Sequence, residues 1–286
     1  MKCCAPLLAA AALAATLGIS DGQTLVDGTN YSGLFGPNSQ VTVTPPTLAE
    51  GTLLDVHLGG SKSGDLGDYW YAQATGGAVL GSNLPLAPEV RLAETGAQVA
   101  LNNGGLDFRI SNNPDSVLGS LGVGLGLALT WSATATFDAP GEELLLLPGT
   151  IYQVSFDVDG SNGLLKSTLG ILPTFGLEML DGNGNPINCP AEDGTLVNVI
   201  GLELLGIVGS PPESGRAVVQ FQTGASVPTG PAGLRFTGSA VLPATALNLG
   251  TNFARVSNIS VTQVVPEPSA FTLGLLGAAF AFRRRR

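Results

Sequence analysis

The segment Leu121 to Phe137 reads Leu-Gly-Val-Gly-Leu-Gly-Leu-Ala-Leu-Thr-Trp-Ser-Ala-Thr-Ala-Thr-Phe and decides the fold class. Every odd position is apolar, and every even position is Gly, Ala, Ser or Thr. Side chains alternate between the two faces of a β-strand, whereas a helix repeats about every 3.6 residues. The period of two therefore predicts a strand whose odd-numbered face is buried.

The same alternation continues on both sides of this segment. Ile151 to Val158 places alternate apolar side chains on one face, and further apolar runs lie at 175–180, 217–221, 234–241 and 254–264. Clusters of Gly, Pro, Asn and Asp separate the runs, as expected for turns between antiparallel strands. Each strand buries one face and needs a second sheet to cover it. We predict one all-β body, an antiparallel β-sandwich, over residues 21–264.

Composition supports this fold class and excludes several functions. Gly and Pro number 40 and 19, and only 12% of residues are charged. Without the two terminal segments, the body holds 7 basic and 21 acidic residues, a net charge of −14. A surface that tracks phosphates needs clustered Lys and Arg, so the charge argues against nucleic acid as a partner.

Cysteine and histidine are too scarce for most metal chemistry. Cys3 and Cys4 lie near the N-terminus, and Cys189 is the one cysteine of the body, so the body forms no internal disulfide. His57 is the one histidine, which excludes sites that need two imidazoles. We expect no metal and no cofactor, and we interpret His57 as a polar strand residue.

Residues 1–20 have the layout of a secretory signal peptide. Lys2 supplies a positive charge, Leu7 to Leu17 forms an apolar run, and small residues follow at Gly18 and Ser20. A helix of about 11 residues is roughly 17 Å long, too short to span a bilayer stably. We expect the segment to be removed on export. The alternative is a buried N-terminal helix.

Residues 265–286 combine three features in a fixed order. Pro266-Glu267-Pro268 comes first, the almost wholly apolar run Ala270 to Phe282 follows, and Arg283, Arg284, Arg285 and Arg286 end the chain. The prolines disfavour helix at the residues before them, and the arginines favour a cytoplasmic location for this end. As a helix the apolar run would be about 20 Å long against roughly 30 Å of hydrocarbon, so it would span the membrane only marginally.

This C-terminal segment resembles the PEP-CTERM sorting signal, in which a Pro-Glu-Pro motif, a short hydrophobic helix and a basic tail are recognised by a membrane-embedded exosortase. The resemblance implies that residues 265–286 form a sorting signal with Pro266, Glu267 and Pro268 as its motif. It also implies export, transient anchoring in the inner membrane by a short transmembrane helix, and final display at the cell surface or release outside the cell. The alternative is a permanent C-terminal anchor.

Two phrases of the body resemble carbohydrate-binding-module-like jelly rolls. They are Leu147 to Phe156, where a strand follows a Pro-Gly turn, and Ala254 to Val261, which carries an Asn-x-Ser-x pattern. This resemblance implies a jelly-roll-like architecture and transfers no ligand residues.

Three groups of residues are candidates for a site. Tyr69-Trp70-Tyr71 is the densest aromatic cluster, and such rings stack on sugars, although core packing is the alternative role. In a strand Trp70 would face away from the two tyrosines. Asp181 to Asn185 places oxygen side chains at alternate positions, as calcium loops do, but a hairpin turn explains the pattern more simply.

Carboxylates that are close in the sequence form the third group. Glu142 with Glu143, and Asp157 with Asp159, are pairs of the kind that glycoside hydrolysis uses across a sugar bond. Neighbours in sequence do not establish that geometry, and we interpret Asp157 and Asp159 as solvent-facing strand residues.

From these observations we expect an exported, exosortase-sorted surface or matrix protein of non-catalytic role with weak polysaccharide binding. Its partners would be the export machinery, the exosortase-type protease and a polysaccharide. The alternatives are an exported carbohydrate-active enzyme, either a glycoside hydrolase or a lyase, and a purely structural scaffold.

Overall fold

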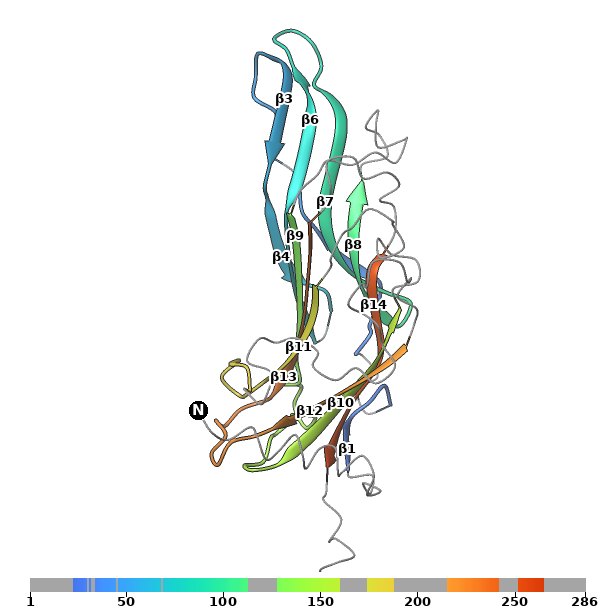
Figure 1. The fold of residues 1–286 in the computed structure, drawn as a ribbon, viewed down its shortest axis with the longest axis vertical. Coiled ribbons are helices and arrows are strands. Elements are labelled where there is room, and N and C mark those ends of the chain that lie inside the picture. Colours follow the sequence, from blue (N-terminus) through green and yellow to red (C-terminus); the bar gives the residue numbers. More distant parts are fainter. Residues whose placement is uncertain are drawn as a thin grey trace, which may run out of the picture.

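Strands make up all the regular secondary structure in the described part of the chain (Figure 1). The computed structural model describes residues 23–29, 31, 34–44, 46–67, 69–112, 128–159, 174–187, 215–241 and 252–264. The expected signal peptide and sorting signal, at 1–20 and 265–286, lie outside the described residues. The all-β prediction is confirmed. Within the described ranges, no helix has the length and apolarity that crossing a membrane requires.

The strands have the following bounds: β1 Thr24–Val26, β2 Ser39–Thr42, β3 Thr52–Leu58, β4 Ser61–Asp65, β5 Trp70–Thr75, β6 Gly77–Asn83, β7 Val90–Asn102, β8 Gly105–Asn112, β9 Ala128–Thr136, β10 Ile151–Asp159, β11 Thr174–Leu180, β12 Gly215–Gln222, β13 Gly233–Val241 and β14 Asn252–Val264.

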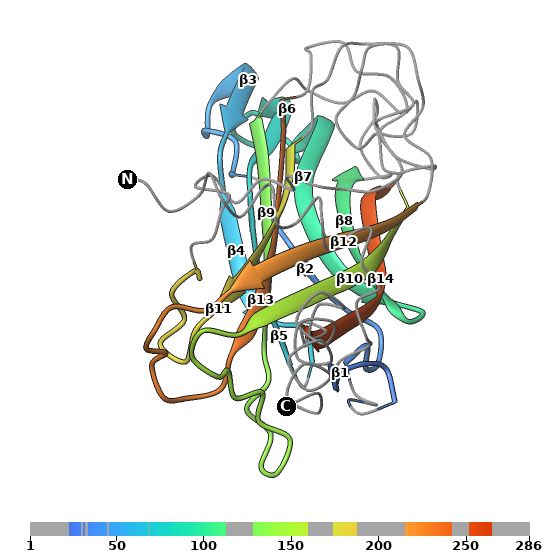
Figure 2. The same cartoon turned by 60° about the horizontal axis from the view of Figure 1, so that its bottom comes forward.

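Two antiparallel sheets divide these strands between them. The larger has nine strands in the order β12-β10-β14-β8-β7-β6-β3, with β1 added on β14 and β2 on β7. The smaller has five strands in the order β11-β13-β9-β5-β4. The larger sheet curls, and Figure 2 shows β12 and β10 crossing in front of β13 and β11 at a steep angle. The two sheets enclose a shared core, as the β-sandwich prediction requires.

The decisive segment of the sequence supplies the central strand of the smaller sheet. In β9 and the residue after it, Leu129, Trp131, Ala133, Ala135 and Phe137 are all buried, and the even positions between them are exposed or half-buried. The prediction of a buried odd face is therefore confirmed for 128–137, while 121–127 lie outside the described residues. Tyr152, Val154, Phe156 and Val158 of β10 are likewise buried.

Aromatic side chains from both sheets meet in the core. Phe156 of β10 packs edge-on against Phe236 of β13, with ring centroids 5.1 Å apart. Trp70 of β5 lies 6.1 Å from the same Phe236 ring. Each buried aromatic or aliphatic side chain contributes about 1.5–3 kcal/mol relative to its exposed state. The Trp70 indole N–H is satisfied at 2.6 Å by the carbonyl oxygen of Leu34.

A single glycine, Gly76, lets the chain cross from the smaller sheet to the larger one. Gly76 joins β5 of the smaller sheet to β6 of the larger, and its φ is +101°. A Cβ at this position would meet the carbonyl oxygen of Ala128 and lie 2.9 Å from Leu129 Cδ2. The crossing therefore requires glycine for two reasons, a backbone conformation that L-residues avoid and a close approach of β9.

Candidate functional site

The outer face of the five-stranded sheet is a grid of polar side chains. Residues paired directly across an antiparallel ladder project on the same face, so the strand register gives the rows of the grid. One row holds Ser61, Thr75, Thr130 and Ser239, the next holds Ser63, Gln73, Ser132 and Thr237, and the third holds Asp65, Tyr71, Thr134, Arg235 and Glu178.

A hollow of about 370 Å³ lies over the middle of this grid. Its lining is formed by Gln73, Thr75, Thr130, Trp131, Ser132, Thr237, Gly238 and Ser239. All of these residues are uncharged. Each hydroxyl donates one hydrogen bond and accepts others, and the Gln73 amide also does both. The lining therefore suits a neutral ligand that itself carries many hydroxyl groups.

Tyr71 stands beside the hollow with half of its surface exposed. Its exposed fraction is 50%, and it is two residues before Gln73 on β5, so the two side chains are about 7 Å apart along the strand. Across the ladder Tyr71 pairs with Thr134 and Asp65. Farther along the same row, Arg235 donates to Glu178 in an ion pair. This row thus contains the exposed ring of Tyr71, the hydroxyl of Thr134 and, at its far end, the Arg235–Glu178 ion pair.

Of the three aromatic residues that the sequence singled out, Tyr71 is the one whose ring faces solvent. Trp70 is 1% exposed and belongs to the core, so it does not reach a surface ligand. Tyr69 packs its ring against Tyr31 and Phe137 at 5.4 and 6.0 Å, and its hydroxyl donates to Glu142 Oε2 at 2.9 Å. The alternation along the strand had placed Trp70 opposite Tyr71, and the structure has this arrangement.

Asp181 to Asn185 forms a turn after β11. The Asp181 Oδ1 atom accepts the backbone N–H of Asn183 at 2.8 Å and that of Asn185 at 3.0 Å. Gly184 has a φ of +77°. One carboxylate oxygen is thus committed to the turn itself, as in an Asx turn. Among the residues that the structure describes, no three His, Cys, Asp or Glu side chains are grouped to hold a metal ion.

One carboxylate of each pair named above, Asp157 and Glu142, bonds to other side chains. Asp157 accepts from Arg216 at 3.2 Å through Oδ1 and from Asn258 at 2.6 Å through Oδ2, on the outer face of the larger sheet. Glu142 accepts from Tyr69 through its side chain and from the Tyr31 hydroxyl through its backbone carbonyl. Burial raises the pKa of Tyr31, and the nearby carboxylates of Glu142 and Glu143 raise it further.

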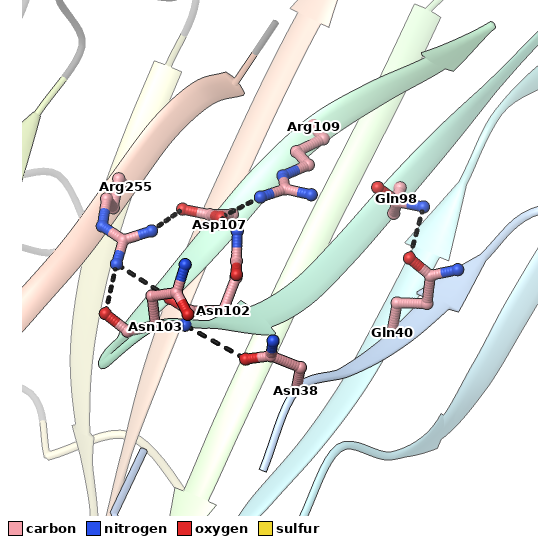
Figure 3. Close-up of polar contacts among 8 residues, drawn as sticks. All are labelled: Asn38, Gln40, Gln98, Asn102, Asn103, Asp107, Arg109 and Arg255. Carbon is pink, nitrogen blue, oxygen red and sulfur yellow. Dashed lines mark hydrogen bonds and ion pairs between the residues drawn. The ribbon is translucent and has the colours of Figure 1, made fainter. Parts of the chain in front are cut away.

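A second polar cluster, which no sequence pattern predicts, lies at the β7–β8 turn (Figure 3). Asp107 of β8 is fully buried and accepts from Arg109 and, at 3.0 Å, from Arg255 of β14. The Arg255 guanidinium also donates to the carbonyl oxygens of Asn102 and Asn103, both at 2.8 Å. The cluster ties the turn to β14, so we assign it a structural role.

The turn beside this cluster has a recognisable sequence signal. Asn103 and Gly104 have φ values of +43° and +76°, and they form a two-residue loop between β7 and β8. Positive φ at both loop residues is the type I′ pattern that Asn-Gly favours. The dipeptide predicts the hairpin, but no local pattern pairs Asp107 with Arg255, because the two are 148 residues apart.

The chain has weak similarity to several solved structures, three of which are described below. No family model and no curated protein matches the chain. A cyclase from Fischerella sp. TAU is similar at 15% identity over 63% of this chain and 78% of its own, with a TM-score of 0.29. A carbohydrate-binding module described for specific mannan recognition has 11% identity over 60% of this chain and 84% of its own, with a TM-score of 0.28. A sugar-binding protein, the EclA C-terminal domain, has 13% identity over 45% of this chain and 64% of its own, with a TM-score of 0.20.

Proposed function

We propose that this chain is an exported, non-catalytic surface or matrix protein whose β-sandwich binds a neutral polysaccharide weakly. The binding surface is the outer face of the five-stranded sheet, with Tyr71 as the stacking residue and the hollow beside it as the hydrogen-bonding subsite. In this proposal the C-terminal segment directs sorting, on the strength of its resemblance to the PEP-CTERM signal.

The observation that carries the binding proposal is the position of Tyr71 next to an uncharged, hydroxyl-lined hollow. An aromatic ring covers the apolar face of a sugar, while hydroxyl and amide groups bond to the sugar's own hydroxyls. An open sheet face with one exposed ring among its described residues offers fewer contacts than a deep pocket, which would bury most of a ligand. The affinity is accordingly expected to be low for each site.

The net negative charge of the body favours neutral ligands over anionic ones. The body has 7 basic and 21 acidic residues, so its field repels anionic polymers such as uronic-acid-rich polysaccharides. The lining of the hollow is neutral, and the cation in the neighbouring row, Arg235, is already paired with Glu178. A neutral glycan is therefore favoured over a charged one.

The test is a binding measurement on immobilised neutral polysaccharides with matched variants. Tyr71→Ala removes the stacking surface and should weaken binding by about 2- to 10-fold, the equivalent of about 0.5–1.5 kcal/mol for one aromatic contact. Tyr71→Phe keeps the ring and should bind nearly as well as the unmodified protein. Gln73→Ala should also weaken binding, because it removes an amide from the hollow.

Gln153→Ala is the matched control, because Gln153 lies on β10 of the other sheet and bonds to Gln220 at 3.3 Å. Equal affinity of the Tyr71→Ala and Gln153→Ala variants would refute the proposed face. Absence of binding to every glycan would favour the scaffold alternative. Hydrolysis of the same polysaccharides, lost on replacing one carboxylate, would replace the binding role with an enzymatic one.

A further inference from the structure

The edge strand β3 carries an exposed apolar stripe. It is the last strand of the larger sheet on one side. The exposed fractions of Leu54, Val56 and Leu58 are 66%, 54% and 60%. Val56 pairs with Leu80 of β6, and Leu58 pairs with Ala78, which is fully buried in the core. The stripe is therefore a continuation of the inner, core-lining face of the sheet.

Among the described residues nothing covers this stripe, because the described strands of the two sheets differ in extent. In Figure 1 the ends of β3, β6 and β7 project beyond β4 and β9 of the smaller sheet. Natural proteins usually protect a sheet edge with charges, proline or a covering segment, since unpaired N–H and C=O groups recruit another strand. On β3 the exposed side chains of the inner face are apolar. The edge therefore combines unpaired backbone groups with exposed apolar surface, which together favour association with another strand.

Some backbone N–H and C=O groups of β3 point away from β6, toward the open edge of the sheet. The Gly59 N–H donates to Gly77 O at 2.7 Å. Bonding residues alternate along an antiparallel ladder, so residue 57 bonds in the same phase toward β6. The N–H and C=O groups of Val56 and Leu58 then point to the open edge.

The sequence of the strand is self-complementary about Val56. It reads Leu54-Asp55-Val56-His57-Leu58. Leucines lie two residues from Val56 on both sides, and the two residues next to Val56 are an acid and an imidazole, which can bond to each other. Asp55 and His57 share the face opposite the stripe, where His57 Nε2 lies 2.9 Å from Asp55 Oδ2. Antiparallel pairing of two such strands centred on Val56 would set Leu54 against Leu58, Val56 against Val56, and Asp55 against His57.

We propose that β3 is a homodimerisation edge, and that its occupant is β3 of a second copy of this chain, antiparallel and centred on Val56. The contact is isologous, because a two-fold axis passes between the two Val56 residues. It continues the larger sheet of one copy into that of the other. The apolar stripes of the two copies merge on one face, and two Asp55–His57 contacts form on the opposite face. A shifted register would lose the charge pairing.

Site-specific cross-linking of the full chain tests the contact. In a background with Cys3, Cys4 and Cys189 replaced by serine, Val56→Cys should form a disulfide-linked dimer under mild oxidation. Directly paired residues of an antiparallel ladder have Cα atoms about 5.5 Å apart, within the range that a disulfide bridges. Leu145→Cys is the control, since Leu145 is 60% exposed, close to the 54% of Val56, but lies outside β3. Equal cross-linking of both variants, or none at Val56→Cys, would overturn the proposal.

A charge exchange tests the register. In the Val56→Cys background, His57→Asp brings like charges together across the edge and should lower the cross-link yield about fivefold. Asp55→Lys alone should also lower it, because it sets an ammonium against the partner copy's imidazole. An equimolar mixture of the two variants should recover the yield, since each strand then meets the opposite charge. A mixture that cross-links no better than either variant alone would rule out the Val56-centred register.

Discussion

At the scale of single residues, Asp107 is the buried carboxylate on which the β7–β8 hairpin depends. It has no exposed surface, and Arg109 and Arg255 donate to its two oxygens. Removing the carboxylate leaves two largely buried guanidinium groups without the negative charge that compensates them. We predict that Asp107→Ala destabilises the fold by about 3–5 kcal/mol, measured by urea unfolding.

Asp157→Ala is the matched control for that prediction. Asp157 also pairs with an arginine, Arg216, but both side chains are substantially exposed. Exposed pairs contribute about 0–1 kcal/mol, so this variant should unfold close to the unmodified protein. If both variants lose a similar free energy of unfolding, the burial of Asp107 does not make its ion pairs more stabilising than exposed ones.

The sequence was informative about residues wherever local alternation decides the outcome. It predicted that Trp70 and Tyr71 lie on opposite faces of their strand and that Trp131 and Phe137 are buried on one face. The structure has both arrangements. It could not show that the Tyr69 hydroxyl meets Glu142, 73 residues away, or that Arg255 reaches Asp107. Those contacts depend on which strands become neighbours, and no local pattern encodes that.

At the scale of elements, Gly76 allows β5 and β6 to belong to different sheets. We predict that Gly76→Ala costs roughly 3 kcal/mol or more, because it combines an unfavourable φ with a clash against the β9 backbone. Gly149→Ala separates the two effects, since Gly149 has a φ of +63° but nothing within 4 Å of an added Cβ. That variant should lose only about 1–2 kcal/mol. Thermal or urea unfolding measures both, and equal losses would mean that the close approach to Ala128 is unimportant.

Element positions were predictable from the sequence, whereas their order in the sheets was not. The runs at 151–158, 217–221 and 254–264 correspond to β10, β12 and β14. Their order, with β10 between β12 and β14, depends on contacts between segments that are far apart in the sequence. The same holds for the candidate site, because the hollow joins β5, β9 and β13, which are distant in sequence.

At the scale of the whole molecule, the sandwich and its two terminal segments have separable roles in our proposal. Deleting Pro266 to Arg286 should change where the protein accumulates while leaving the β circular dichroism signal unchanged. Intact mass of protein recovered from outside the cell should lack residues 1–20 and the C-terminal arginines. Recovery of surface protein that keeps Arg283 to Arg286 would instead support the permanent anchor, and a retained Met1 would contradict leader removal.

The pairing of β1 with β14 has a consequence for the timing of folding. These two strands come from opposite ends of the body, and β14 also separates β10 from β8 in the larger sheet. A ribosome that has not yet synthesised Asn252–Val264 has therefore made a chain with a gap in its principal sheet. Contacts between distant segments also form slowly. A nascent chain of this topology therefore keeps this gap in its larger sheet until Asn252–Val264 have been synthesised.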